Sequence, residues 1–328
     1  MSGQTDDPTS TVDAVSVSKL VKRYGDMLAL DYFDLNVRQG EIFGLLGPNG
    51  SGKTTAINCI LALLSFDEGS VRVFGEPISP TSYALKRRIG IVPQNVAVFN
   101  ELTVQENIDY FCSLYAPNRA HRRELVSEAL DFVDLNDYRG YRPSKLSGGL
   151  LRRLNIACGI AHKPDLIFFD EPTVAVDPQS RNAILKGIQR LNREGATVIY
   201  TSHYMEEVEQ ICDRILIMDH GRYLALGTAE ELKTMIDTGE RISIETDDLG
   251  GHANAADTTL ERLRTLPFVA SADYDGHELT VNCRRGDHNL IDILQLLEQT
   301  GTHIGHLSSR QPTLNDVFLE LTGTALRD

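Results

Sequence analysis

The sequence lacks any run approaching the ~18 apolar residues that a membrane-spanning helix needs. It also has no tryptophan and only five cysteines in 328 residues. The cysteines are odd in number and far apart, which argues against a disulfide framework and against metal-ligand spacing. We therefore expect reduced thiols in a cytoplasmic protein, and any membrane role to be carried by a partner chain. The cysteines are Cys59, Cys112, Cys158, Cys212 and Cys283.

Positive charge is scarce: 32 Lys and Arg face 46 Asp and Glu, a net charge of -14. This balance argues against a nucleic-acid coat, so we expect no nucleic-acid partner. The basic pairs Arg87-Arg88, Arg122-Arg123 and Arg152-Arg153 are expected on solvated faces or beside carboxylates. Residues 1–13 are polar, show no signal peptide and are predicted to form a disordered tail.

One stretch matches the phosphate-binding pattern Gly-x-x-x-x-Gly-Lys-[Ser/Thr] in full. A buried-strand pattern precedes it and an apolar helix pattern follows it at 55–64. Glycines let the backbone curl so that N–H groups point inward, and the helix N-terminus adds partial positive charge. Lys53 is expected to reach the β- and γ-phosphates and Thr54 to hold Mg²⁺. A chance glycine-rich turn is the alternative. The predicted phosphate loop is Gly47, Pro48, Asn49, Gly50, Ser51, Gly52, Lys53 and Thr54.

Strand and helix patterns divide the chain into two predicted domains. Antiparallel strand patterns occupy 14–40, a helical block covers about 95–160, with one helix predicted from Glu124 to Phe132, and short apolar strand runs alternate with helices. We expect an α/β P-loop domain over 14–239, with a mainly parallel sheet, an antiparallel β subdomain and a helical subdomain. Residues 240–328 predict a small C-terminal α/β accessory domain with the strand and helix order of a ferredoxin-like fold.

Two adjacent carboxylates end a later strand run. Asp170 closes the apolar run 166–169, and Glu171 follows it directly. Phosphoryl transfer needs a metal-holding carboxylate and a group that orients the attacking water. Asp170 suits the Mg²⁺ shell and Glu171 suits the water. Taken alone, the pair is more typical of an acidic turn at a strand end, but a complete phosphate loop elsewhere in the chain favours the catalytic interpretation.

A second glycine motif precedes a helix pattern at 151–160. Ser147 is suited to cap this helix, and Gly148 and Gly149 expose N–H groups at its positive end. An ordinary capped helix is the simpler interpretation of this Ser-Gly-Gly segment (Leu146–Leu150) taken alone. One chain rarely needs two phosphate-contacting surfaces for one γ-phosphate, whereas two chains packed head to tail would each supply one.

The motifs, in their order along the chain, resemble the ATP-binding subunit of ABC transporters over about 15–239. The resemblance implies an ATPase in which two copies sandwich two ATP molecules, each bound by one phosphate loop and the opposite Ser-Gly-Gly segment. ATP closes the dimer and hydrolysis reopens it, which moves a separate membrane permease. The residues that carry the resemblance are the phosphate loop, Gln94, the Ser-Gly-Gly segment, 166–171, Asp177-Pro178 and His203.

The resemblance also assigns roles to single residues. Tyr24 would stack on adenine, Gln94 would contact Mg²⁺ and the water, His203 would contact the γ-phosphate, and Asp177 would lie at the dimer seam. The subunit would be peripheral on the inner face of the cell membrane, held by its permease. The predicted site thus has Glu171, His203 and Gln94 as catalytic residues, Thr54, Gln94 and Asp170 around Mg²⁺, and Tyr24, the phosphate loop, Thr55, Ser147, Gly148, Gly149 and Asp177 around ATP.

Two positions depart from the family pattern. Leu150 stands where the family usually has Gln, and Val174 stands where it usually has Ser. We expect a working ATPase whose turnover rate these departures leave open. Residues 312–323, 154–157 and 178–182 resemble the daunorubicin-resistance type of subunit, which implies export of drugs, lipids, polysaccharides or peptides. A plain amphipathic helix explains the apolar stripe of 312–323 equally well.

Two other functions stay open at this point. A soluble ABC-type ATPase acting on nucleic acid or ribosomes usually carries two cassettes or a long coiled-coil insertion, and neither is seen in this sequence. An importer ATPase with a regulatory tail is the other alternative, and the pattern of 312–323 argues against it. The sequence does not identify the cargo, because specificity belongs to the permease.

Overall fold

The computed structural model describes residues 13–236, 238–250, 256–284 and 289–323. The tail predicted for 1–13 lies, apart from Asp13, outside the described residues. The chain divides into two compact units, with Ala229 in the first and Glu230 in the second. The boundary predicted from the sequence lies after residue 239. Among the described residues, no helix is long and apolar enough to cross a membrane.

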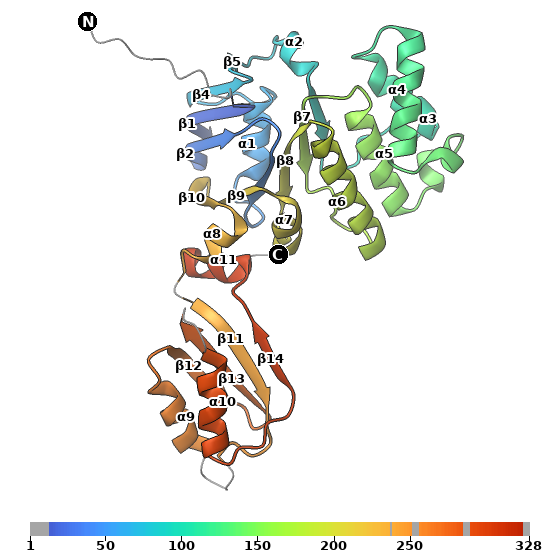
Figure 1. Cartoon of the computed structure of the whole chain (residues 1–328). Coiled ribbons are helices and arrows are strands. Elements are labelled where there is room, and N and C mark those ends of the chain that lie inside the picture. The colour runs from blue at the N-terminus through green and yellow to red at the C-terminus, as the bar shows by residue number, and fades with distance from the viewer. Residues whose placement is uncertain (1–12, 237, 251–255, 285–288, 324–328) are drawn as a thin grey trace, which may run out of the picture. The chain divides into compact units, whose positions relative to one another are not determined.

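The first unit is built on a six-stranded sheet with the order β10-β9-β3-β8-β7-β6 (Figure 1). All neighbours are parallel except the pair β9 and β10. The central strands β3, β7 and β8 are buried along their whole length and are mostly apolar, as strands covered on both faces require. The strands are β3 (Ile42–Leu46), β6 (Ile89–Val92), β7 (Leu166–Asp170), β8 (Thr197–Ser202), β9 (Arg214–Asp219) and β10 (Arg222–Gly227).

A second, antiparallel sheet in this unit has the order β2-β1-β4-β5. Its inward-facing side chains share one apolar core with the parallel sheet and with the helix that follows the phosphate loop. The strands are β1 (Val15–Tyr24), β2 (Met27–Val37), β4 (Glu68–Val73) and β5 (Glu76–Pro77). The mainly parallel sheet and the antiparallel subdomain predicted from the sequence are thereby confirmed.

Helices α3, α4 and α5 gather beside the sheet as a separate helical block (Figure 1). Thr103 begins α3 with the predicted capping box, and Ser147 caps α5 through the Leu150 N–H. Helix α4 begins at Arg119, earlier than the predicted Glu124, because Asn118 accepts hydrogen bonds from two backbone N–H groups. The helices are α1 (Lys53–Ile60), α2 (Tyr83–Lys86), α3 (Val104–Ser113), α4 (Arg119–Phe132), α5 (Gly148–Ile160), α6 (Pro178–Arg193), α7 (Met205–Ile211) and α8 (Ala229–Lys233).

The second unit is an antiparallel four-stranded sheet with the order β12-β13-β11-β14. Helices α9 and α10 pack their apolar side chains on this sheet in a core of their own (Figure 1). The element order and strand order are those of a ferredoxin-like fold with one added helix, as predicted. The elements are β11 (Thr238–Glu245), α9 (Ala256–Arg264), β12 (Val269–Tyr274), β13 (Glu278–Arg284), α10 (Asn289–Gln299), β14 (Leu307–Arg310) and α11 (Leu314–Thr322).

A pair of glycines lets α5 lie directly on β6. A Cβ on Gly159 would lie 2.6 Å from the Ile91 carbonyl oxygen, and a Cβ on Gly90 would lie 2.6 Å from the Gly159 carbonyl oxygen. Neither position has room for a methyl group, and a backbone carbonyl oxygen is among the nearest obstacles at both. The close contact fixes α5 against the strand that leads to Gln94.

Replacing Gly159 with alanine should lower the unfolding temperature of the first unit, at a cost of about 1–3 kcal/mol, because backbone must move apart. Gly187→Ala is the matched control in α6, where the nearest atom to the added methyl would be a Phe132 ring carbon at 3.5 Å. That variant should gain up to about 1 kcal/mol from helix propensity. Calorimetry of the full chain measures both, and equal effects of the two variants would contradict the close-contact account.

Candidate active site

Four strand ends meet at one edge of the parallel sheet. The strands β3, β8, β7 and β6 are consecutive neighbours and run in the same direction. The segments that follow them therefore emerge together, which is where α/β sheets bind ligands. These segments carry the phosphate loop, His203, Glu171 and Gln94 respectively.

The phosphate loop turns sharply into α1. Gly50 and Gly52 have φ of 82° and 107°, a region that favours glycine. Gly52 is the N-cap of α1, and no side chain caps this helix end. The buried Ser51 hydroxyl oxygen has no hydrogen-bond partner in the part of the chain that the structure describes. An uncapped helix N-terminus in such a loop is suited to an anion, above all a phosphate.

Lys53 is buried and directed into the loop. Its Nζ donates to the Gly47 carbonyl at 2.8 Å and to the Pro48 carbonyl at 3.1 Å. The same Nζ lies 3.4 Å from Glu171 Oε1. Burial lowers the pKa of Lys53 below its usual value, while the Glu171 carboxylate acts in the opposite direction. A buried cation is thus held ready beside a carboxylate.

Glu171 is the centre of the predicted catalytic group. Gln94 Nε2 donates to Glu171 Oε2 at 3.0 Å, and His203 Nδ1 lies 3.5 Å from the same oxygen. Glu171 has φ of 47°, which is strained for a residue with a Cβ. Its backbone N–H donates to the Thr201 hydroxyl at 2.9 Å, which holds this conformation.

Asp170 lies beside Thr54, as the metal prediction requires. The Thr54 hydroxyl donates to Asp170 Oδ2 at 3.2 Å, and the Thr201 hydroxyl donates to Oδ1 at 2.7 Å. Mg²⁺ in phosphate sites is commonly held by one or two side-chain oxygens, substrate phosphates and waters. The adjoining hydroxyl and carboxylate are a donor set that fits this ion.

A pocket of about 440 Å³ covers this edge of the sheet. Residues predicted from the sequence line most of it, namely Tyr24, Asn49, Gly50, Gly52, Lys53, Thr54, Thr55, Gln94 and Glu171. Tyr24 is 45% exposed, so its ring is free to stack on a ligand. The sequence reasoning missed Met27, Leu28, Ala29 and His220, which complete the wall. Of these, Met27, Leu28 and Ala29 follow the Tyr24 turn, and that proximity was the available signal.

Nine predicted residues do not line this pocket, and five of them, Gly47, Pro48, Ser51, Asp170 and His203, belong to or contact the segments that do. The other four lie at the starts of two helices. Ser147 and Asp177 are the N-caps of α5 and α6. The two helix ends adjoin, since a Cβ on Gly149 would lie 2.5 Å from the Ser180 hydroxyl and 3.3 Å from Asp177 Oδ2. The lining of the pocket includes neither Ser147, Gly148, Gly149 nor Asp177. One chain therefore presents the phosphate loop and the Ser-Gly-Gly segment as separate surfaces.

Helix α5 holds the segment that carries Gln94. Arg152 Nη1 donates to the Gln94 carbonyl at 2.7 Å, and Asn155 Nδ2 donates to the Pro93 carbonyl at 3.1 Å. Asn155 Oδ1 also accepts from the Ala97 N–H at 3.0 Å. The expectation that Arg152 lies on a solvated face or beside a carboxylate is wrong: its side chain is buried and binds carbonyl oxygens. An arginine pair in a helix pattern gives no signal for such a role.

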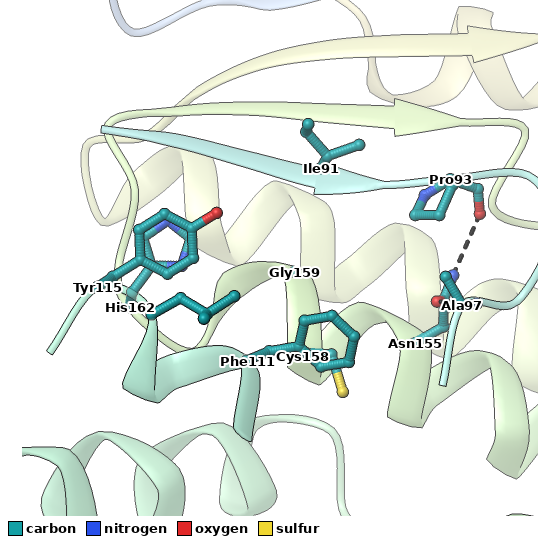
Figure 2. A pocket seen from close by; sticks show the side chains of 10 residues that line it. Ile91, Pro93, Ala97, Phe111, Tyr115, Asn155, Cys158, Gly159 and His162 are labelled. Carbon is teal, nitrogen blue, oxygen red and sulfur yellow. Dashed lines mark hydrogen bonds between the residues drawn. The ribbon is translucent and has the colours of Figure 1, made fainter. Parts of the chain in front are cut away.

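An apolar groove of about 270 Å³ lies between β6, the end of α3 and α5 (Figure 2). At one end the rings of Tyr115 and His162 stack with centroids 3.8 Å apart. Beside the groove, the rings of Phe99, Tyr110 and Phe111 contact one another, and the first two are partly exposed. This apolar groove is lined by Ile91, Pro93, Ala97, Phe111, Leu114, Tyr115, Asn155, Cys158, Gly159 and His162.

Both units of the chain match families of known proteins. Residues 30–174 match the family model of ABC transporters, and residues 227–322 match that of the C-terminal domain of DrrA1-3-like ATP-binding proteins. The linearmycin resistance ATP-binding protein LnrL of Bacillus subtilis is 37% identical over 96% of this chain and 100% of its own length. The daunorubicin/doxorubicin resistance ATP-binding protein DrrA of Streptomyces peucetius is 36% identical over 96% and 94%.

A solved structure agrees with the first unit. The dimeric structure of MJ0796, a bacterial ABC transporter cassette, superposes with a TM-score of 0.60 and 28% identity, over 65% of this chain and 98% of that one. The likeness confirms the predicted P-loop ABC fold. The roles of the single site residues stay predictions, since the comparisons do not test them.

The buried pair of Lys53 and Glu171 generates a stability prediction. Lys53→Met should destabilise the nucleotide-free chain by about 3 kcal/mol, because it leaves a buried carboxylate without its cation. Adding Glu171→Gln should recover part of that loss, since the unpaired charge is then gone. Thermal unfolding of the two single variants and the double variant measures the coupling. If the double variant loses as much stability as the two single variants together, the ion pair contributes nothing to folding.

Proposed function

The chain belongs to the ATP-binding subunits of ABC transporters, of the daunorubicin-resistance type, and from that premise we propose that it drives an exporter. It is an ATP-hydrolysing subunit. In the proposal, two copies enclose two ATP molecules and move a separate membrane permease. The observation that carries the proposal is the meeting of Lys53, Gln94 and His203 on the carboxylate of Glu171.

ATP binding rests on the phosphate loop. The uncapped end of α1 and the buried Ser51 hydroxyl offer donors for which no side-chain cap or hydrogen-bond partner is found among the described residues. The triphosphate would take these donors together with the Lys53 ammonium, and Tyr24 would stack on the adenine. Thr54 and Asp170 would hold Mg²⁺, which neutralises charge on the phosphates.

In the proposed hydrolysis, each side chain around Glu171 has its own role. When ATP binds, the Lys53 ammonium pairs with the phosphates in place of Glu171. The Glu171 carboxylate is then free to accept a proton from the attacking water. The water oxygen forms the new bond to the γ-phosphorus, and the bond from that phosphorus to the leaving oxygen of ADP breaks. The Gln94 amide orients Glu171 and the water, and His203 contacts the γ-phosphate from the neighbouring strand end.

The dimer is proposed because four of the predicted ATP contacts, Ser147, Gly148, Gly149 and Asp177, do not line the pocket. The Ser-Gly-Gly segment and Asp177 form one surface at the adjoining ends of α5 and α6. Two chains arranged head to tail would bring this surface onto the partner's phosphate loop. The similar structure of MJ0796 is dimeric, which supports a dimer of this chain.

The permease is proposed to dock in the apolar groove. The groove, with the partly exposed Phe99 and Tyr110 beside it, suits an apolar cytoplasmic segment of a membrane protein. Pro93 and Ala97 line the groove, and Gln94 between them reaches Glu171. An occupant would therefore act on the hydrolysis group through the segment that α5 holds. In the proposal, this docking holds the subunit on the inner face of the membrane.

The alternatives are weaker. A nucleic-acid or ribosome ATPase is disfavoured by the net charge of -14. An importer subunit is disfavoured by the second unit, because residues 227–322 match a domain of drug-resistance ATP-binding proteins. The cargo is proposed by analogy alone. Among the relatives are proteins named for resistance to linearmycin and daunorubicin and for export of Nod factor, which favour a drug or a Nod factor-like molecule as the cargo.

Glu171→Gln should lower ATP turnover by at least about 100-fold, since a general base contributes a factor of this size. ATP binding should persist, so ATP-dependent dimers should accumulate in light scattering with Mg²⁺, more in this variant than in the wild type. Glu206→Gln, which changes an exposed carboxylate nearby, is the matched control. Undiminished turnover in Glu171→Gln would sink the proposed role, and a dimer that forms without ATP would locate the contact elsewhere.

Leu114→Asp should release the chain from its permease, because a charge would enter the apolar groove. We expect recovery with washed membranes of the native host to fall by about tenfold, the effect of losing 1.4 kcal/mol of binding. Leu63→Asp is the matched control, since Leu63 is 63% exposed and Leu114 58%, and Leu63 is outside the groove. ATP-dependent dimers should persist in both variants. Equal membrane recovery of both variants would remove the groove as the docking site.

A further inference from the structure

A buried carboxylate outside the pocket gathers four side chains. Glu207, in α7, is 3% exposed. Its Oε2 accepts hydrogen bonds from the Thr173 hydroxyl at 2.7 Å, the Tyr200 hydroxyl at 2.7 Å and the Ser202 hydroxyl at 3.1 Å. Its Oε1 lies 3.1 Å from Arg181 Nε, in an ion pair without hydrogen-bond geometry.

These partners belong to the segments that carry the hydrolysis group. Thr173 is two residues after Glu171, and Ser202 immediately precedes His203. The Ser202 hydroxyl also accepts from the Tyr204 N–H at 2.9 Å, so both sides of His203 are held. One carboxylate therefore ties the chain after β7 to the end of β8.

Arg181 adds a third segment. It lies in the first turns of α6, the helix that Asp177 caps. Its guanidinium also lies over the Tyr204 ring, 4.8 Å from the centroid. The start of α6 is thus connected through Arg181 to Glu207 and to the residue that follows His203.

The network depends on the charge of Glu207. Burial, and next the Glu207 carboxylate, raise the pKa of Tyr200 well above its usual range, so its hydroxyl stays a donor. Three hydroxyl donors and one guanidinium compensate the cost of burying the carboxylate. A glutamine at position 207 would point an N–H donor at hydroxyl groups that already act as donors. It would also leave the Arg181 guanidinium without an opposite charge.

We propose that Glu207 is a positioning residue for ATP hydrolysis: it fixes Glu171 and His203 relative to each other and to the α6 end that bears Asp177. The inference rests on the proposed roles of Glu171 and His203. Glu207 is outside the lining of the pocket, so it acts through Thr173, Ser202 and Arg181. Loss of the network leaves the ATP pocket intact and misplaces the groups that act on the water.

The test is ATPase kinetics of the full chain for Glu207→Gln and Arg181→Gln. Displacements of about 1 Å at reacting groups cost up to about 100-fold in rate. Glu207→Gln should therefore lower kcat by about 10-fold to 100-fold while KM for ATP changes by less than about twofold. Arg181→Gln, at a side chain one-third exposed, should lower kcat in the same way but less. Unfolding temperatures are measured alongside.

Glu206→Gln is the matched control. Glu171→Gln distinguishes a failure of this inference from a failure of the proposed function. ATP hydrolysis by the wild type but not by Glu171→Gln would support the proposed function. If Glu207→Gln and Arg181→Gln then have the same kcat as Glu206→Gln, the inference is overturned while the proposed function stands. A lower unfolding temperature with unchanged kcat has the same meaning, because the network would then serve folding alone. Should Glu207→Gln fail to fold, Arg181→Gln decides: an unchanged kcat overturns the inference and a reduced kcat at constant KM supports it.

Discussion

The parallel register of β3, β8, β7 and β6 is the constraint on which the active site depends. The predicted site residues follow the carboxyl end of each strand. Only parallel neighbours bring four such ends to one edge of the sheet. A slip of one residue in β7 would turn Asp170 to the opposite face, away from Thr54 and Thr201. The mostly apolar strands, of which β3, β7 and β8 are buried along their whole length, therefore determine the geometry of residues that are themselves polar.

Local patterns predicted a large part of the fold and of the pocket. The phosphate loop and the caps at Thr103 and Ser147 are contiguous in sequence, and their structure is determined by residues within a few positions. The ferredoxin-like order of the second unit followed from strand and helix periodicity. The family resemblance supplied Tyr24, Gln94 and His203, which no local pattern identifies.

What the sequence did not predict are tertiary contacts made by residues with ordinary local patterns. Glu207 follows Glu206 in an acidic helix, so nothing in its neighbourhood indicates burial. Arg152 and Asn155 belong to α5, and the carbonyl groups that they bind lie about 60 positions away along the chain. The helix predicted over 55–64 ends at Ile60, because Ala62 adopts a left-handed conformation with φ of 50°. Sequence periodicity does not register such a backbone reversal.

The contact of α5 with β6 has a consequence for how such a subunit changes partners during evolution. One helix carries the Ser-Gly-Gly segment at its start, holds the Gln94 segment at its middle and forms a wall of the apolar groove near its end. The glycine contact prevents it from shifting locally along the strand. In the proposed assembly, a substitution that reshapes the groove for a new permease is therefore transmitted to the surface proposed to meet the second copy. On that proposal, specificity for the membrane partner and the timing of the ATPase cycle should vary together among related subunits, and not as independent traits.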